Sequence, residues 1–291
     1  MKSMSTAISR SLMTLAVVGL GLALTPRTAS AALITFTVDE SAVPGATSQS
    51  FSVDGMTAKY VEALTLDGIT GTFTGHIVVN FTAYTLTNNP TPDQIGAVDP
   101  GEASGANLYS MYALVTASGT FAPIALSGGR TLFDFLPTAS TADLYLDPLR
   151  DTTKSTAGPS ATGGAADDLH ILTAGTLNTS LSNGEVFTRA GVILSGSFAL
   201  IYTDPAVVSP TGPLYWPTLS SFILTSAVAS GDVDPTEECT PNCSFPDAVV
   251  GDVSISFQGK PIPEPATLTL LGLGLVGSGF AARRRKAGAR S

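Results

Sequence analysis

Short runs in which apolar and polar residues alternate are the feature that most constrains how this chain can fold. The longest run extends from His76 to Leu86. It follows the run Lys59–Leu66, and between the two stand Asp67-Gly68, a hairpin-type turn signal, and Ile69–Phe73. Alternation with a period of two predicts strands that bury one face, because successive side chains of a strand point to opposite sides.

Runs of the same kind recur along most of the chain, while 29 Gly and 19 Pro disfavour long helices. Two polar stretches, residues 88–105 and 154–168, have the composition of loops. The predicted fold class is therefore all-β, an antiparallel β-sandwich or a jelly-roll-like variant of it, over residues 32–258. The remaining predicted strands are Leu33–Val38, Ser50–Val53, Leu108–Thr116, Gly119–Leu126, Thr131–Leu136, Asp143–Leu146, Leu169–Leu177, Gly184–Arg189, Val192–Tyr202, Phe222–Val228 and Val249–Phe257.

The N-terminus has the three parts of a secretory signal peptide over residues 1–31. Lys2 and Arg10 give it a positive start, and an uncharged apolar run from Leu12 to Leu24 follows. Ala29 and Ala31 form a small-x-small cleavage site, so cleavage after Ala31 leaves residue 32 as the first of the exported chain. A retained anchor helix is the alternative.

The C-terminus, residues 259–291, has the features of a second targeting signal. Pro263, Glu264 and Pro265 precede the uncharged stretch 266–282, which at about 1.5 Å per residue reaches the low end of a bilayer span as a helix. The basic tail 283–291 follows, beginning with Arg283, Arg284 and Arg285. Positive residues behind a span stay in the cytoplasm, which places the bulk of the chain outside it.

Pro-Glu-Pro, a Leu/Gly-rich span and an arginine cluster at the extreme C-terminus resemble the PEP-CTERM sorting signal of exopolysaccharide-producing Gram-negative bacteria. The resemblance implies processing by an exosortase, a membrane transpeptidase-like enzyme that removes the tail. It further implies transient anchoring in the inner membrane through this span, and export to the cell surface or the extracellular matrix.

Without its two ends the chain is strongly acidic. Eight of the 14 Lys and Arg residues lie in the signal peptide and the basic tail 283–291, and six, up to Lys260, remain against 23 Asp and Glu, a net charge of −17 with Glu264 included. Such a charge excludes nucleic acid as a natural partner and favours divalent cations as a bridge to acidic polysaccharide. Solubility alone is an equally valid reading of the same charge.

Two features stand close together near residue 240. Cys239 and Cys243 are the only cysteines, and an even number in an exported chain predicts a disulfide, which here closes a short loop. Just before them, Asp232, Asp234, Glu237 and Glu238 offer carboxylates of the kind that calcium takes on flexible loops. A solvated acidic loop without an ion is the alternative, and no other cofactor is expected.

Signals for catalysis are weak, and we expect no enzyme. Only His76 and His170 are available, and no G-x-S-x-G elbow occurs in the exported portion. A carboxylate pair for glycoside hydrolysis needs only two acids, so a secreted carbohydrate-active hydrolase stays open as an alternative. Tyr215 and Trp216 are the candidate stacking platform for a neutral glycan, with a buried core position as the other interpretation.

The segment Phe36–Ala46, with Val-Asp-Glu-Ser followed by Val-Pro-Gly, resembles the opening of floc-formation-associated PEP-CTERM proteins. That resemblance implies a matrix protein that associates with exopolysaccharide and promotes flocculation or biofilm formation. A first strand ending in a turn explains the same residues without any function. A purely structural envelope protein is the third hypothesis.

Overall fold

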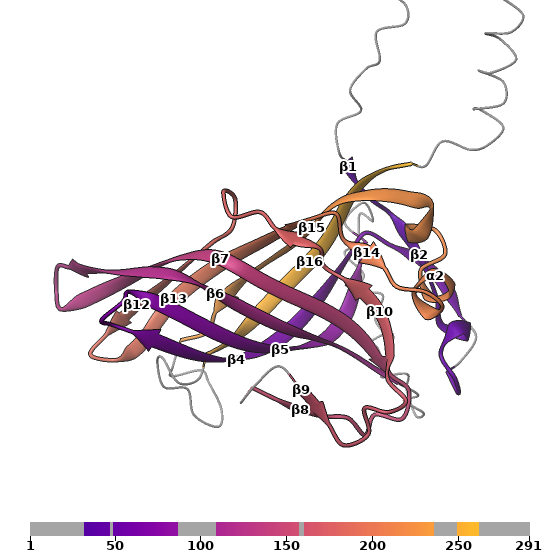
Figure 1. The fold of residues 1–291 in the computed structure, drawn as a ribbon, viewed down its shortest axis with the longest axis horizontal. Helices are drawn as coiled ribbons and strands as arrows, with labels where there is room; N and C mark the ends of the chain where they lie inside the picture. The colour runs from indigo at the N-terminus through magenta and orange to yellow at the C-terminus, as the bar shows by residue number, and fades with distance from the viewer. Residues whose placement is uncertain (1–31, 47–48, 87–108, 157–159, 236–248, 262–291) are drawn as a thin grey trace, which may run out of the picture. The chain divides into compact units, whose positions relative to one another are not determined.

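The computed structural model describes residues 32–46, 49–86, 109–156, 160–235 and 249–261, and nearly all regular structure in them is antiparallel β (Figure 1). Three short helices interrupt the strands: η1 (Glu40–Ala42), α2 (Thr211–Tyr215) and η2 (Leu219–Ser221). The strands are β1 (Ala32–Leu33), β2 (Phe36–Asp39), β3 (Ser50–Val53), β4 (Gly55–Asp67), β5 (Thr72–Thr85), β6 (Ser110–Leu126), β7 (Arg130–Asp147), β8 (Thr153–Ser155), β9 (Ser160–Thr162), β10 (Leu169–Thr173), β11 (Thr176–Leu177), β12 (Asn183–Arg189), β13 (Val192–Thr203), β14 (Ala206–Val207), β15 (Phe222–Val233) and β16 (Val249–Pro261).

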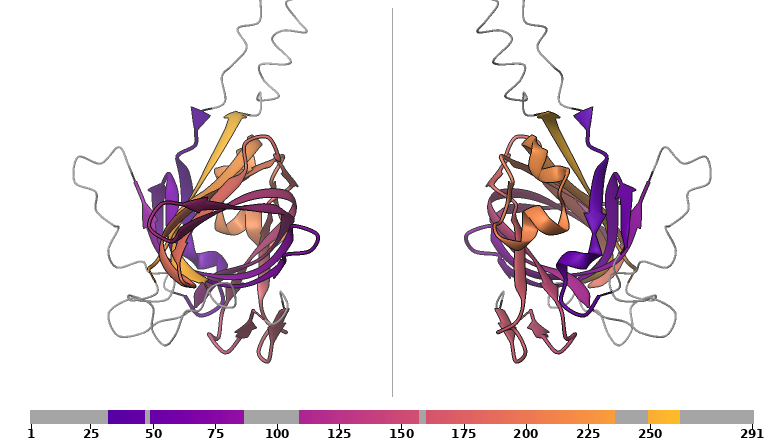
Figure 2. Two further views of the ribbon diagram at one scale, coloured as in Figure 1. Left: turned by 90° about the vertical axis from the view of Figure 1, so that its left-hand side faces the viewer. Right: turned by 90° about the vertical axis from the view of Figure 1, so that its right-hand side faces the viewer.

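The main sheet closes on itself. Its consecutive neighbours are β13, β15, β16, β4, β5, β6 and β7, and β12 then pairs with both β7 and β13. Figure 2 shows these strands running around a common interior. The antiparallel all-β prediction is confirmed, but the structure differs from the predicted sandwich, because one large sheet takes the place of two packed sheets.

Long strands and local bulges account for the closure. β6 and β7 have 17 and 18 residues, where the sequence predicts two short strands in place of each. Their register shifts between Ser118 and Gly119, and such a bulge bends a strand and increases its twist without ending it. A Cβ on Gly119 would lie 2.2 Å from the carbonyl oxygen of Leu136, so only glycine allows the two backbones to approach at this bend.

The alternating pattern places one face of each strand in the interior of the closed sheet. On β5, Ile77 and Val79 line this interior, as the alternation between His76 and Leu86 predicts. The predicted turn at Asp67 is present: its carboxylate accepts hydrogen bonds from the backbone N–H groups of Ile69 and Thr70, at 2.8 and 3.2 Å.

β2, near the start of the described chain, packs against α2 and contributes to a cluster of aromatic side chains. The Phe36 ring meets Trp216 and Phe257 edge to face, with centroids 5.8 and 5.7 Å apart. Contacts join α2 to β10, to η1 and to β2, and Figure 1 shows α2 and β2 on the side away from the β6–β7 turn. The N-terminal segment is therefore an integral part of the fold.

A buried polar network joins this segment to the sheet. Tyr109 donates a hydrogen bond of 2.6 Å to the carboxylate of Glu40, and the Tyr215 hydroxyl lies 2.8 Å from Tyr109 and 2.6 Å from Tyr84. Burial raises the pKa of Glu40, and the bond from Tyr109 partly offsets that rise. Asp39 caps η1 by accepting a hydrogen bond from the backbone N–H of Ser41.

Candidate functional sites

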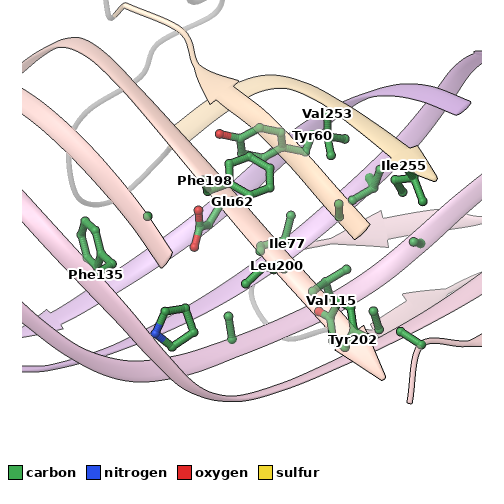
Figure 3. Close-up of a pocket in the computed structure, with 18 of the residues that line it drawn as sticks. Tyr60, Glu62, Ile77, Val115, Phe135, Phe198, Leu200, Tyr202, Val253 and Ile255 are labelled. Atoms are coloured by element: carbon green, nitrogen blue, oxygen red, sulfur yellow. The ribbon is translucent and has the colours of Figure 1, made fainter. Parts of the chain in front are cut away.

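A cavity of about 120 Å³ lies inside the closed sheet. Aliphatic and aromatic side chains from several strands of the sheet form most of its lining, among them Ile77 of β5, Val115 of β6, Phe135 of β7 and Leu200 of β13 (Figure 3). Exposed polar residues of β12 and β13 stand where this lining meets solvent, namely Asn183, Glu185 and Ser197. The cavity is thus an apolar chamber with a polar rim on one side.

Glu62 of β4 brings a carboxyl group into this apolar chamber (Figure 3). Burial raises the pKa of Glu62 to about 7. Among the residues that the structure describes, no hydrogen-bond donor or cation partners this carboxyl. Gly75 on the neighbouring strand makes the position sterically feasible, because a Cβ there would lie 2.1 Å from Oε1 of Glu62.

The tyrosine hydroxyls of the cavity are already engaged elsewhere. Tyr60 donates to the backbone carbonyl of Asp232 at 3.0 Å, and the Tyr202 hydroxyl lies 2.7 Å from Oγ of Ser140. Burial raises the pKa of Tyr202 to about 12 and raises that of Tyr60 further, so both stay protonated at neutral pH. Among the described residues that line the interior, the carboxyl of Glu62 is consequently the polar group left to interact with a ligand.

Three acidic side chains converge next to the β8–β9 hairpin. Carboxylate oxygens of Asp147, Asp151 and Asp167 lie within 4.8 Å of one another. Asp147 is fully buried and lies 3.7 Å from the ammonium group of Lys154, while Oδ2 of Asp167 is buried without a hydrogen-bond partner in the described part of the chain. Calcium prefers oxygen ligands from loops such as these, so this group is the one among the described residues that could hold a cation.

The predicted calcium loop falls partly outside the described residues. Asp232 is the second-last residue of β15 and accepts a hydrogen bond of 3.3 Å from the backbone N–H of Asp252, and the N–H of Asp234 donates to the carbonyl of Val250. Glu237 and Glu238 lie in residues 236–248, which are not described, and so do Cys239 and Cys243. The calcium site on this loop and the disulfide stay predictions.

Tyr215 and Trp216 are both fully buried. Trp216 packs against Phe36 and Phe257, and Tyr215 belongs to the network with Glu40. Neither ring presents an exposed face on which a sugar could stack. Their burial favours the alternative interpretation of the pair as core aromatics.

Neither histidine forms a triad-like arrangement with other residues that the structure describes. Nε2 of His170 lies 3.0 Å from Asp143, 3.1 Å from the Leu172 carbonyl and 3.3 Å from Thr173, so one ring nitrogen serves all three groups. A triad uses both nitrogens, one for the orienting acid and one for the nucleophile. His76 has a buried Nδ1 without a partner among the described residues, and it lies on a strand.

Two of the candidate sites, Glu62 in the cavity and the cluster of three aspartates, were not predicted from the sequence. Glu62 has a local signal, because it shares a strand face with Tyr60 and Leu64 and is the one acidic residue on that face. The grouping of Asp147 with Asp151 and Asp167 depends on a loop that returns to the sheet, and its only sequence signal is a local excess of aspartate.

Comparisons with known proteins identify the C-terminus. The PEP-CTERM protein-sorting motif matches residues 261–286, which confirms the prediction made from Pro263, Glu264, Pro265 and the arginine cluster. The match covers the sorting signal alone, so the finer resemblance of Phe36–Ala46 to floc-associated proteins stays a prediction. No curated protein matches the chain.

Two solved structures show weak likeness to the chain. One is Ail, the attachment invasion locus protein of Yersinia pestis, at 9% identity over 72% of this chain and 97% of that one. The other is Neisserial surface protein A, at 11% identity over 71% and 96%. Each has a TM-score of 0.13, which is too low to carry an argument. Within the described ranges, no helix combines the length and apolar character required for a membrane span.

Proposed function

Because this chain carries a PEP-CTERM sorting motif, which directs a protein through an exosortase to the cell surface, we propose that it is an exported matrix protein that binds exopolysaccharide and promotes flocculation or biofilm formation. The sorting motif is the observation that carries the proposal. It supports the proposal because a chain sorted to the cell surface would come into contact with extracellular polysaccharide, and the resemblance of Phe36–Ala46 supports it further.

The charge of the exported portion supports binding through cations. With six basic residues against 23 acidic ones, the protein has too few cationic side chains to neutralise an acidic glycan directly. Divalent cations would have to bridge carboxylates of the protein to those of the polysaccharide. The acidic cluster of Asp147, Asp151 and Asp167 shows that the fold can bring such carboxylates together.

We propose adhesion without turnover. Sites for drug-sized ligands enclose about 300–1,000 Å³, and a saccharide also needs several hydrogen-bonding partners. The interior cavity has about 120 Å³ and a mainly apolar lining, so it is a poor site for hydrolysis of a sugar chain. A glycan would therefore bind the outer surface of the protein.

Co-sedimentation with the source organism's own polysaccharide tests the proposal. Purified protein is incubated with the polysaccharide in calcium or in chelator, and bound protein and released reducing ends are measured. Binding that chelator abolishes, without release of sugar, is the expected result. Release of reducing ends at catalytic rates would establish the hydrolase alternative, and absence of binding in calcium would leave the structural envelope protein.

Charge-matched variants separate a local site from the total charge. The double variant Asp151→Asn/Asp167→Asn removes two charges from the cluster, and Asp134→Asn/Glu185→Gln removes two charges elsewhere. Equal weakening in both variants indicates bridging by the overall charge. Selective weakening in the first assigns the calcium-dependent contact to the cluster.

A further inference from the structure

We propose that the cavity inside the closed sheet binds a small amine, whose apolar part fills the chamber and whose ammonium group pairs with the carboxylate of Glu62. The inference concerns the interior of the protein and is independent of glycan binding at its surface. It rests on the position of Glu62, on the charges that line the cavity and on the cavity volume.

Glu62 is in an environment that disfavours a carboxylate without a partner, although its side chain is half-buried and not sealed from solvent. The interior around it is apolar, the hydroxyls of Tyr60 and Tyr202 are engaged elsewhere, and no described side chain donates a hydrogen bond to it. A charge in apolar surroundings without a partner is costly even when its side chain is half-buried, and the cost is relieved by protonation or by a cation. Gly75 leaves room for this carboxyl, since any larger residue there would displace it.

The charges of the lining residues favour a positively charged ligand. No Lys, Arg or His belongs to the part of the cavity wall that the structure describes. The titratable groups that face the chamber besides Glu62 are Tyr60 of the same strand, Glu185 of β12 and Tyr202 of β13. A carboxylate ligand would meet only like charges and tyrosines, whereas an ammonium group meets two carboxylates.

Volume and shape limit the ligand to about one ring. A cavity of 150 Å³ lined by aliphatic and aromatic side chains holds a benzene molecule, so the cavity here, with about 120 Å³, encloses no more than most of one ring and leaves the rest of the ligand at the polar rim. The rings of Tyr60 and Phe198 meet edge to face with centroids 5.2 Å apart, and their π-faces are further partners for a cation. Benzylamine has a suitable size and charge to serve as a probe.

Titration of the purified protein with benzylamine, toluene and benzoate, followed by protein NMR at pH 8 and pH 5, tests the proposal. At pH 8 we expect benzylamine to bind at least about tenfold more tightly than either other probe. At pH 5 its affinity should fall by about 100-fold, because a carboxyl with a pKa of about 7 is then ionised in only about one molecule in a hundred. Equal affinity at the two pH values would overturn the proposal, as would tight binding of benzoate or no binding of benzylamine.

Three variants assign the effect to the cavity. Glu62→Gln preserves the shape of the side chain and should remove the preference for benzylamine over toluene, whereas the rim variant Glu185→Gln should retain most of it. Ala227→Leu fills part of the chamber and should abolish binding of both probes. A preference for benzylamine over toluene that survives Glu62→Gln, or binding of benzylamine that survives Ala227→Leu, contradicts the proposal. If Glu62→Gln fails to fold, the pH comparison on the unaltered protein decides.

Discussion

Replacement of Glu62 by glutamine should stabilise the protein, although the residue lies in the interior. The pKa of this carboxyl is raised from 4.5 to about 7 by burial, a difference of about 2.5 pH units. A shift of one pKa unit corresponds to about 1.36 kcal/mol, so ionised Glu62 lowers the free energy of unfolding by at most about 3 kcal/mol, and by less to the extent that solvent screens this half-buried side chain. Glutamine has the same shape and no charge to desolvate, and it removes this cost.

The pH dependence of the effect follows from the direction of the shift. Because the folded-state pKa lies above the unfolded value, the folded state favours the protonated carboxyl. The cost is absent below about pH 4.5, grows as pH rises through the interval to about 7, and is complete above it. The unaltered protein should therefore lose stability over this interval relative to Glu62→Gln.

Urea unfolding of both proteins at pH 5 and pH 8 measures the effect. We expect Glu62→Gln to be more stable by about 1–3 kcal/mol at pH 8 and by less than about 1 kcal/mol at pH 5. Glu185→Gln, in which an exposed glutamate of the cavity rim loses its charge, is the matched control and should show little difference at either pH. A variant no more stable than the parent at pH 8, or a difference that does not change with pH, would refute the reading of Glu62 as a half-buried carboxyl without a partner in apolar surroundings.

Four further predictions concern the polar network, the bulge and the chain ends. Tyr109→Phe leaves Glu40 buried without its hydrogen bond and should lower the free energy of unfolding by about 2 kcal/mol in urea titrations, more at pH 8 than at pH 5; an unchanged midpoint would contradict the network. Gly119→Ala should cost about 2 kcal/mol, while Gly68→Ala, whose Cβ would meet nothing, should change stability by less than about 0.5 kcal/mol, and equal effects would contradict the close approach at the bulge. Intact-mass measurement of secreted material should find neither Met1–Ala31 nor the basic tail, and a mass that includes the tail would disprove its removal. Thiol labelling of the native exported protein should detect no free cysteine, and labelling of both would disprove the disulfide.

The strands could be predicted from the sequence because their signal is local. Alternation along His76–Leu86 and the turn at Asp67 both reflect neighbours within a few residues, and the structure confirms them. The division of β6 and β7 into shorter strands was wrong for the same reason. Gly119 resembles a strand break in the sequence, whereas in the structure it is a bulge within a continuous strand.

Closure of the sheet could not be predicted from local patterns. It depends on the pairing of β12 with β7, in which Gly184 faces Phe135 across almost fifty intervening residues. Any antiparallel strand with one apolar face serves equally in a sandwich and in a closed sheet, so composition does not distinguish the two. The cavity is a consequence of closure, and for this reason Glu62 had no predicted role even though its place on an apolar strand face was visible.

The segment Phe36–Ala46 shows how a sequence resemblance can follow from structural requirements. Asp39 caps η1, and Glu40 is buried and accepts the hydrogen bond of Tyr109. Phe36 packs against Trp216, so the beginning and the later part of the described chain depend on each other. Each of these roles concerns folding, and none presents a side chain to a glycan. Proteins that share this segment would therefore share the way the N-terminal segment joins the sheet, while their partners would be determined by the sorting motif and by the charge of the outer surface.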